Sequence, residues 1–181
     1  DLGQSGNGAC LRCGYGIPNA IDERLLKYFN KYISKNEERI FSESKDSTRC
    51  CKVATKTKTL SSLYEMIDGA FENAIDRFIE RFYYFNDITS KEELTMLRFE
   101  NKNYYKEHTE CAPGGGIGRK LCLYAIIESP EEGGVISFSH QGDKITPQVG
   151  SIIVFPSCAL HPVKVSHVKS GKLTYLNTFF F

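Results

Sequence analysis

The chain has 181 residues and a formal net charge of +1, with 25% charged and 41% hydrophobic residues. This length and composition predict one soluble globular domain with a sizeable core, and the balanced charge makes nucleic acid an unlikely partner. No apolar run approaches the about 18 to 20 residues that span a bilayer, so we expect no membrane segment.

The chain contains seven cysteines, an odd number, and no secretory leader is visible at its N-terminus. Both features favour reduced thiols and a cytoplasmic location. Cys10 and Cys13 form a C-x-x-C pair, but the adjacent Cys50 and Cys51 lack the spacing of a matching zinc knuckle. We therefore expect free thiols or an incidental disulfide in this Gly-rich leader.

Two helices are predicted in the first half of the chain. The first covers about residues 22–34 and the second about residues 61–85, where apolar residues recur at spacings of three and four. Such a stripe is typical of a helix packed on a sheet. Between them, residues 42–59 are polar and rich in lysine, which predicts a loop or irregular strand. This basic segment either simply faces water or lies over a site and meets an acidic or phosphorylated substrate.

The second half of the chain shows the spacing of strands. Residues 112–118 include four glycines and predict a loop at the rim of a pocket, since the Lys-Ser/Thr of a phosphate-binding loop does not follow. Turns are predicted at residues 128–134, 141–144 and 169–171, and strands at residues 121–127, 135–138, 145–155 with a break at Gly150, 160–168 and 172–181. Helices followed by many short strands predict a β-sandwich or jelly roll with the helices packed on one sheet.

A candidate metal site begins in the stretch that ends in His108, Thr109 and Glu110. Side chains alternate faces along a strand, so His108 and Glu110 point the same way and can meet one cation. His161 follows a strand-like apolar run and is the natural third ligand in an antiparallel sheet. Two histidines and one carboxylate that leave positions open are associated with non-haem Fe(II) sites. The alternative for the triplet alone is a surface histidine beside a surface glutamate.

Several segments in order resemble the prolyl 4-hydroxylase-like branch of the Fe(II)- and 2-oxoglutarate-dependent dioxygenases. The similarity covers about residues 16–181. The family's metal strand, roughly Arg-Tyr-x-x-Gly-x-x-Tyr-x-x-His-x-Asp, is similar to residues 98–110, with Tyr105 in register. The apolar strand that ends in Glu132-Gly133-Gly134 and the segment around His161 also follow the family pattern. The resemblance implies a double-stranded β-helix (jelly-roll or cupin-like) core, mainly β with flanking helices.

This resemblance implies that His108, Glu110 and His161 bind Fe(II). The family usually carries Asp at the position of Glu110. It also places a basic residue for the distal carboxylate of 2-oxoglutarate on the last strand. Lys172 lies near that position, although an ungapped alignment puts Leu173 there, and one residue reverses the face of a strand. We expect Lys172 to bind the co-substrate.

Four further residues are candidates for the co-substrate site. Lys120 and Arg119 are the substitutes for Lys172 on a neighbouring strand, because a buried carboxylate needs a cationic partner. Tyr105 and Tyr124 are expected hydroxyl donors to 2-oxoglutarate, with core packing as the alternative for each.

The implied activity is hydroxylation of a C–H bond, with Fe(II), 2-oxoglutarate and O2 required and ascorbate as reductant. A prolyl or other peptide side chain is the first substrate expected, followed by a free amino acid or small metabolite, and then a nucleic-acid base. Three alternatives stay open: a catalytically silent jelly-roll binding module, a dioxygenase acting on a metabolite or base, and a zinc hydrolase on a cupin-like barrel. The last would need a general base near the metal.

One dioxygenase-like domain is expected over residues 1–181. Within it, residues 1–15 form the Cys/Gly-rich leader, residues 16–92 a helical support region, and residues 93–181 the jelly-roll core. The sequence predicts no particular oligomeric state.

Overall fold

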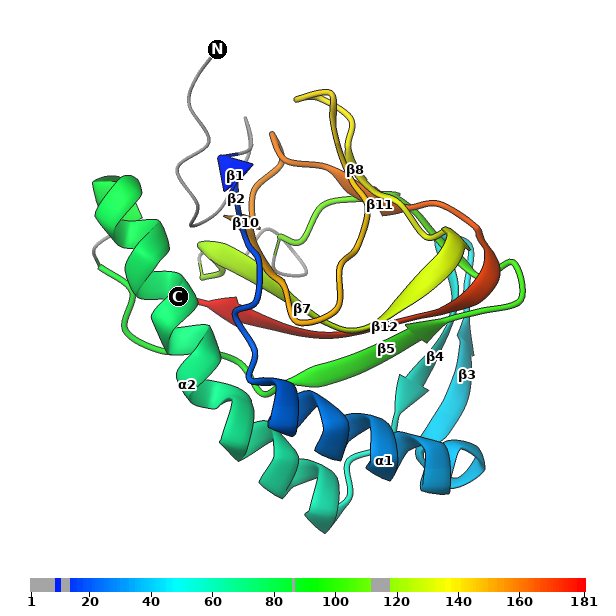
Figure 1. The fold of residues 1–181 in the computed structure, drawn as a ribbon. Coiled ribbons are helices and arrows are strands. Elements are labelled where there is room, and N and C mark those ends of the chain that lie inside the picture. The colour runs from blue at the N-terminus through cyan, green and yellow to red at the C-terminus, as the bar shows by residue number, and fades with distance from the viewer. Residues whose placement is uncertain (1–8, 11–13, 86, 112–117) are drawn as a thin grey trace.

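The computed structural model describes residues 9, 10, 14–85, 87–111 and 118–181. Two long helices lie against a strongly curled antiparallel sheet (Figure 1). The helices are α1 (Glu23–Ile40) and α2 (Lys58–Arg81), and the short 3-10 helix η1 (Tyr83–Phe85) follows α2. Within the described residues, neither α-helix is long and apolar enough to cross a bilayer.

The described strands form one sheet in the order β1-β2-β10-β7-β12-β5-β4-β6-β11-β8-β9, with β3 paired to β4. Their bounds are β1 (Ala9–Cys10), β2 (Tyr15–Ile17), β3 (Phe41–Lys45), β4 (Arg49–Ala54), β5 (Thr95–Phe99), β6 (Tyr104–His108), β7 (Leu121–Gly133), β8 (Ile136–Phe138), β9 (Asp143–Ile145), β10 (Ile152–Pro156), β11 (Val163–Val165) and β12 (Val168–Phe180). Strand β4 pairs with β5 through residues 52 and 53 and with β6 through residues 49 and 50. It therefore connects these two strands within the curled sheet. The predicted architecture, a jelly-roll core with helices on one sheet, is confirmed.

Strand β7 separates two apolar cores because its side chains alternate between the two faces of the sheet. Leu121, Leu123 and Ile127 pack against the helices, whereas Tyr124 and Ile126 face the interior of the curled sheet. This explains why β7 reads as a continuous apolar run. Both of its faces are covered.

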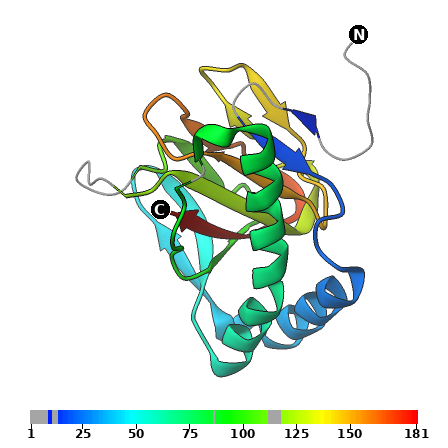
Figure 2. The ribbon, with the colours of Figure 1, turned by 90° about the vertical axis from the view of Figure 1, so that its left-hand side faces the viewer.

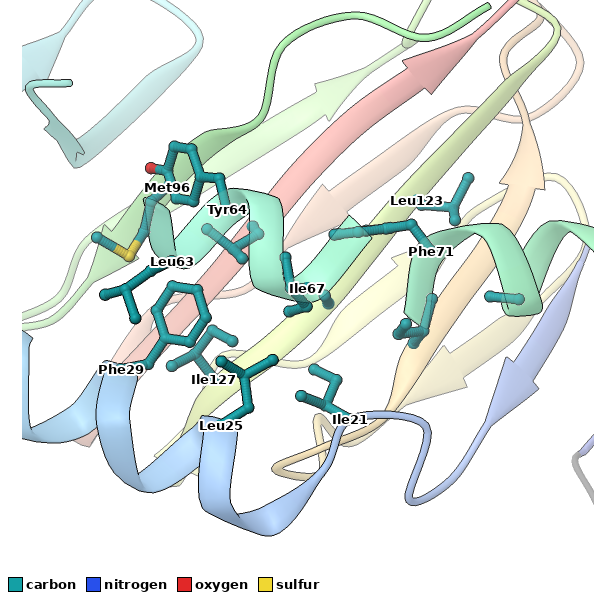
Figure 3. Close-up of a cluster of buried hydrophobic side chains, with 14 of the residues drawn as sticks. Ile21, Leu25, Phe29, Leu63, Tyr64, Ile67, Phe71, Met96, Leu123 and Ile127 are labelled. Atoms are coloured by element: carbon teal, nitrogen blue, oxygen red, sulfur yellow. The ribbon is translucent and has the colours of Figure 1, made fainter. Parts of the chain in front are cut away.

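The helices cover the outer face of the sheet, and α2 runs across it (Figure 2). The close-up in Figure 3 shows Phe29 of α1 and Ile67 and Phe71 of α2 beside Leu123 and Ile127 of β7. All five side chains are fully buried or nearly so. Burial of each such side chain contributes about 1.5 to 3 kcal/mol relative to exposure, so this layer fixes the sheet that carries the site.

Local caps set where the helices begin. The Asp22 carboxylate accepts hydrogen bonds from the backbone N–H groups of Arg24 and Leu25, and the Thr57 hydroxyl accepts one from Leu60. Helix α1 extends six residues beyond its predicted end at residue 34. Charged residues near the C-terminal end of α1 interrupt the apolar spacing that predicts a helix. One of them, Glu37, forms ion pairs with Arg98 and Lys172 of the sheet.

The polar segment over residues 42–59 is more regular than predicted. It forms the β3–β4 hairpin, in which Phe41 pairs with Ala54 and Lys45 pairs with Cys50, and it then begins α2. Of the two predicted alternatives, the loop is wrong for most of this segment, and the strand is present but regular rather than irregular. Charged residues occur here because β3 lies at an edge of the sheet, where side chains reach water.

Two predicted turns are in fact strand. Residues 128–133 and 169–171 lie opposite each other in the long β7–β12 ladder, where Gly171 pairs with Pro130. Glycine is required at position 171, because φ is +75° and a Cβ would lie 2.8 Å from the backbone N of Glu131. Each segment resembles a turn by itself, and only their mutual pairing makes them extended.

The remaining predicted strands are shorter than expected. The break predicted at Gly150 is present but wider than expected, since residues 146–151 are not strand and separate the end of β9 from β10. The predicted strand over 160–168 contains only β11 and the first residue of β12. The side chains of the Cys10–Cys13 pair and residues 112–117 of the predicted Gly-rich loop lie outside the described residues.

Candidate metal centre

His108 and Glu110 lie side by side at the end of β6. The His108 Nδ1 atom is 2.8 Å from the carbonyl oxygen of Lys106. A carbonyl can only accept, so Nδ1 carries the proton and donates it. The other ring nitrogen, Nε2, is 3.2 Å from Glu110 Oε1, and the two side chains are only 12% and 10% exposed. We call these two residues the His108–Glu110 pair.

The position of Glu110 is fixed by Tyr124 of β7, whose hydroxyl donates a hydrogen bond to Glu110 Oε1. Tyr124 is fully buried and stacks on Tyr175, with ring centroids 4.4 Å apart. Burial, and then the charge of Glu110, raise the pKa of Tyr124 well above its ordinary value, so the hydroxyl keeps its proton. Tyr124 was expected to donate to 2-oxoglutarate. Instead its hydroxyl is engaged by Glu110.

Tyr105 packs against the other member of the pair. Its ring stacks on that of His108, with centroids 3.6 Å apart and planes 12° from parallel. Burial, followed by the charge of Glu110, raises the pKa of the Tyr105 hydroxyl. Tyr105 therefore orients the imidazole and keeps a neutral hydroxyl close to the pair.

His161 is brought to the same end of the sheet by the pairing of β11 with β6. Val163 lies opposite His108 in this antiparallel register. His161 comes two residues before Val163, and Glu110 comes two residues after His108. The His161 Nδ1 atom is hydrogen-bonded to Cys158 Sγ at 2.9 Å. Burial, and then the charge of His140, lower the pKa of His161, which favours the neutral imidazole that binds metals.

The side chains of His108, Glu110 and His161 do not form one three-ligand group in the structure. Among the residues that the structure describes, no cluster of three or more His, Cys, Asp or Glu side chains could hold a metal ion. The structure thus brings together His108 and Glu110, and the pairing of β11 with β6 brings the segment that carries His161 to the same end of the sheet. The ligand set of all three remains a prediction.

The His108–Glu110 pair nevertheless fits a cation. The Nδ1–H of His108 is committed to Lys106, so in a neutral ring the Nε2 lone pair faces the Glu110 carboxylate. Two acceptors 3.2 Å apart repel each other unless a proton or a metal ion lies between them. Imidazole and carboxylate together are donors that first-row divalent metals accept.

The Lys172 side chain lies on the face of β12 opposite to the candidate metal site. Its Nζ atom is 2.6 Å from Glu37 Oε1 of α1 and 3.7 Å from Glu100 Oε2. Leu173, its neighbour, packs in the interior core instead. The expectation that Lys172 faces the co-substrate is therefore wrong in position, because the alternation of β12 turns Leu173 inward.

Lys120 is also engaged elsewhere. Its Nζ atom lies 2.7 Å from Asp87 Oδ2 and 3.0 Å from the Asp87 carbonyl oxygen, and its side chain is 36% exposed. Arg119, the other substitute, lines a cavity of about 250 Å³ together with Glu110 and Tyr105.

The same cavity contains residues that the sequence did not identify. Arg49 of β4 and Asn177 of β12 both lie in its wall. Arg49 reaches it because β4 pairs with β6, where Arg49 lies opposite Tyr105. The basic composition of residues 42–59 was the only signal for Arg49 in the sequence.

The sequence matches no protein-family model and no curated protein. Its fold, however, matches solved structures. The viral collagen prolyl hydroxylase of Paramecium bursaria Chlorella virus-1, in complex with 2OG, has a TM-score of 0.71 and 17% identity, covering 93% of this chain and 96% of that chain. A prolyl hydroxylase of Trichoplax adhaerens, in complex with a peptide fragment of the hypoxia inducible factor oxygen degradation domain, has a TM-score of 0.70 and 12% identity, covering 92% and 82%.

A third similar structure, the prolyl-4-hydroxylase of Pseudomonas putida, has a TM-score of 0.68 and 12% identity, covering 91% of this chain and 90% of that chain. Identities this low carry the fold and leave the activity to be argued from the site. The chain therefore has the double-stranded β-helix fold of the prolyl hydroxylases, as its sequence resemblance predicted.

Proposed function

We propose that this chain is an Fe(II)- and 2-oxoglutarate-dependent oxygenase that hydroxylates a C–H bond of a prolyl or other peptide side chain, or of a free amino acid. One observation carries the proposal: a buried imidazole nitrogen and a buried carboxylate oxygen face each other at 3.2 Å. Two similar structures support the substrates, since one is a complex with 2OG and another a complex with a peptide.

His108, Glu110 and His161 would hold the iron, and the residues behind them would orient them. The Lys106 carbonyl accepts from Nδ1 of His108, which leaves Nε2 as the ligand atom. Nδ1 of His161 lies 2.9 Å from Cys158 Sγ, and with the ring proton donated to this sulfur Nε2 would be the ligand atom there as well. A backbone carbonyl on the second ring nitrogen, as at His108, is usual for metal-binding histidines.

Two tyrosines complete the arrangement. Tyr124 donates to Oε1 of Glu110, the same oxygen that faces Nε2 of His108, and so holds the carboxylate beside the imidazole, while the stacked Tyr105 ring limits rotation of His108. When bound, iron with 2-oxoglutarate and O2 supplies the oxidant, giving succinate, CO2 and the hydroxylated product, with one oxygen atom in succinate and one in the product. Ascorbate would keep the iron reduced between turnovers.

A catalytically silent jelly-roll module is the second candidate. Two observations favour it: Leu173 takes the inward place where the family carries its cation, and the described residues hold no three-ligand cluster. In that case Nε2 of His108 would simply donate a hydrogen bond to Glu110.

Metal binding separates the two candidates. Protein purified without chelator and titrated anaerobically with Fe(II) is expected to bind one equivalent per chain, because a cation relieves the repulsion within the His108–Glu110 pair. Binding should weaken at acidic pH, where a proton competes for the imidazole nitrogen. A chain that takes up no Fe(II) at neutral pH would be the silent module.

A further inference from the structure

Two arginines from distant parts of the chain line the same cavity as Glu110. Arg49 lies at the start of β4 and Arg119 precedes β7. We propose that Arg49 and Arg119 form a carboxylate-binding site beside the His108–Glu110 pair.

Arg119 is held rigidly and keeps an edge of its guanidinium for a ligand. Its Nε and Nη2 atoms donate to the two carboxylate oxygens of Glu92 at 2.7 Å and 2.8 Å. The guanidinium also lies over the ring of Phe179, with its central carbon 3.4 Å from the ring centroid. Among the described residues Nη1 has no hydrogen-bond acceptor, so the Nη1–Nη2 edge can form a second fork with another carboxylate.

Arg49 presents a donor that the described residues leave unsatisfied. Its Nε atom is buried and has no hydrogen-bond partner among them, and the closest carboxylate oxygen, Asp46 Oδ2, is 3.5 Å away. A buried donor that has only this ion pair at 3.5 Å, and no hydrogen bond, is free to donate to a closer acceptor such as a ligand carboxylate oxygen. The guanidinium lies 5.8 Å from the ring centroid of Tyr105, so that acceptor would sit near the His108–Glu110 pair.

Asn177 adds a third polar group to the cavity wall. Its Oδ1 atom is buried and has no partner within the described part of the chain. Turning this amide by 180° presents its N–H2 group, which can donate to an anion. Among the described residues that line the cavity, Glu110 is the one carboxylate, and it stands against the guanidinium groups of Arg49 and Arg119.

The carboxylate bound by Arg49 and Arg119 can belong to either of two molecules. Both assignments rest on the proposed function. The first is the distal carboxylate of 2-oxoglutarate, which Lys172 cannot meet because it pairs with Glu37 on the other face of β12. The second is an acidic group of the substrate itself. The two sources share the same chemistry at the arginines.

The test uses glutarate, a five-carbon dicarboxylate that lacks the 2-oxo group, titrated calorimetrically into the metal-free protein. We expect binding that weakens about tenfold to a hundredfold in Arg49→Gln and in Arg119→Gln, the usual range for the loss of a charge-assisted hydrogen bond. Lys172→Gln removes the same charge from the other face and should bind glutarate like the parent. Thermal unfolding of each variant confirms that the fold persists.

Repeating the titration with Mn(II) and saturating 2-oxoglutarate separates the sources. Loss of glutarate binding assigns the site to the co-substrate, and retained binding assigns it to the substrate. The proposal is overturned if the parent binds no glutarate, or if both arginine variants bind it like the parent. Because the first titration needs no metal and no turnover, its failure is distinct from failure of the proposed oxygenase.

Discussion

Replacing His108 by alanine is expected to weaken Fe(II) binding by more than about a hundredfold and to abolish turnover, while the protein stays folded. Loss of a group behind a metal ligand already costs about 10-fold to 100-fold in affinity, so loss of a ligand should cost more. The fold should persist because the interior core beside β6 is built from other side chains, such as Phe99, Tyr175 and Val163. Anaerobic Fe(II) titration and thermal unfolding measure the two effects.

His167 provides the matched control. It is exposed, and its ring lies against that of Tyr104 at the far end of β6 from the pair, with ring centroids 4.8 Å apart and planes tilted by 45°. His167→Ala should bind Fe(II) like the parent. Full stoichiometric binding by His108→Ala would remove His108 from the site.

Replacing Arg98 by alanine is expected to destabilise the fold by about 3 to 5 kcal/mol, the cost of removing one partner from a buried ion pair. Arg98 is fully buried between the sheet and α1. It donates to the Thr174 hydroxyl at 2.9 Å, pairs with Glu128, and has its Nη1 atom 3.0 Å from Glu37. Without the guanidinium, both carboxylates would lose a cation. Urea unfolding of the variant and the parent at pH 7 gives the difference.

An exposed pair serves as the comparison for Arg98. Lys56 and Glu93 are 2.8 Å apart, with side chains 56% and 80% exposed, so Lys56→Ala should change stability by less than about 1 kcal/mol. A loss below about 1 kcal/mol for Arg98→Ala as well would show that this network does not hold α1 on the sheet.

The same network gives a direction for acid unfolding. The hydrogen bond from Lys172, and then the charge of Arg98, lower the pKa of Glu37 below its ordinary value of 4.5. A lowered carboxyl pKa contributes stability that is complete above the unfolded-state pKa and is lost as the pH falls through the folded-state value. In Arg98→Ala the pKa of Glu37 should rise, so this loss would begin at a higher pH.

The helices and the central strand could be predicted because local spacing reflects their burial. The apolar stripe of α2 packs on one face, and the continuous apolar run of β7 is covered on both. Pairing between distant segments could not be predicted in the same way. Residues 128–133 are extended only because β12 lies beside them, and the β3–β4 hairpin pairs polar residues whose sequence indicates a loop.

The candidate site was predictable to the same degree. The alternation of a strand placed His108 and Glu110 together, and they are adjacent. The residue of β12 that faces inward depends on the register of the strand, which the sequence left uncertain by one residue. In the structure Leu173 faces inward and Lys172 does not. Arg49 lies far from the metal strand in sequence and reaches the cavity through the β4–β6 pairing, which leaves no local pattern.

The most direct test of the central claim is to measure succinate. The parent protein, supplied with Fe(II), ascorbate, O2 and 2-oxoglutarate, should form succinate slowly even without its substrate, and faster once a peptide or amino acid that it hydroxylates is added. His108→Ala should form none under the same conditions, whereas His167→Ala should match the parent. If the parent binds Fe(II) yet forms no succinate, the oxygenase proposal is contradicted.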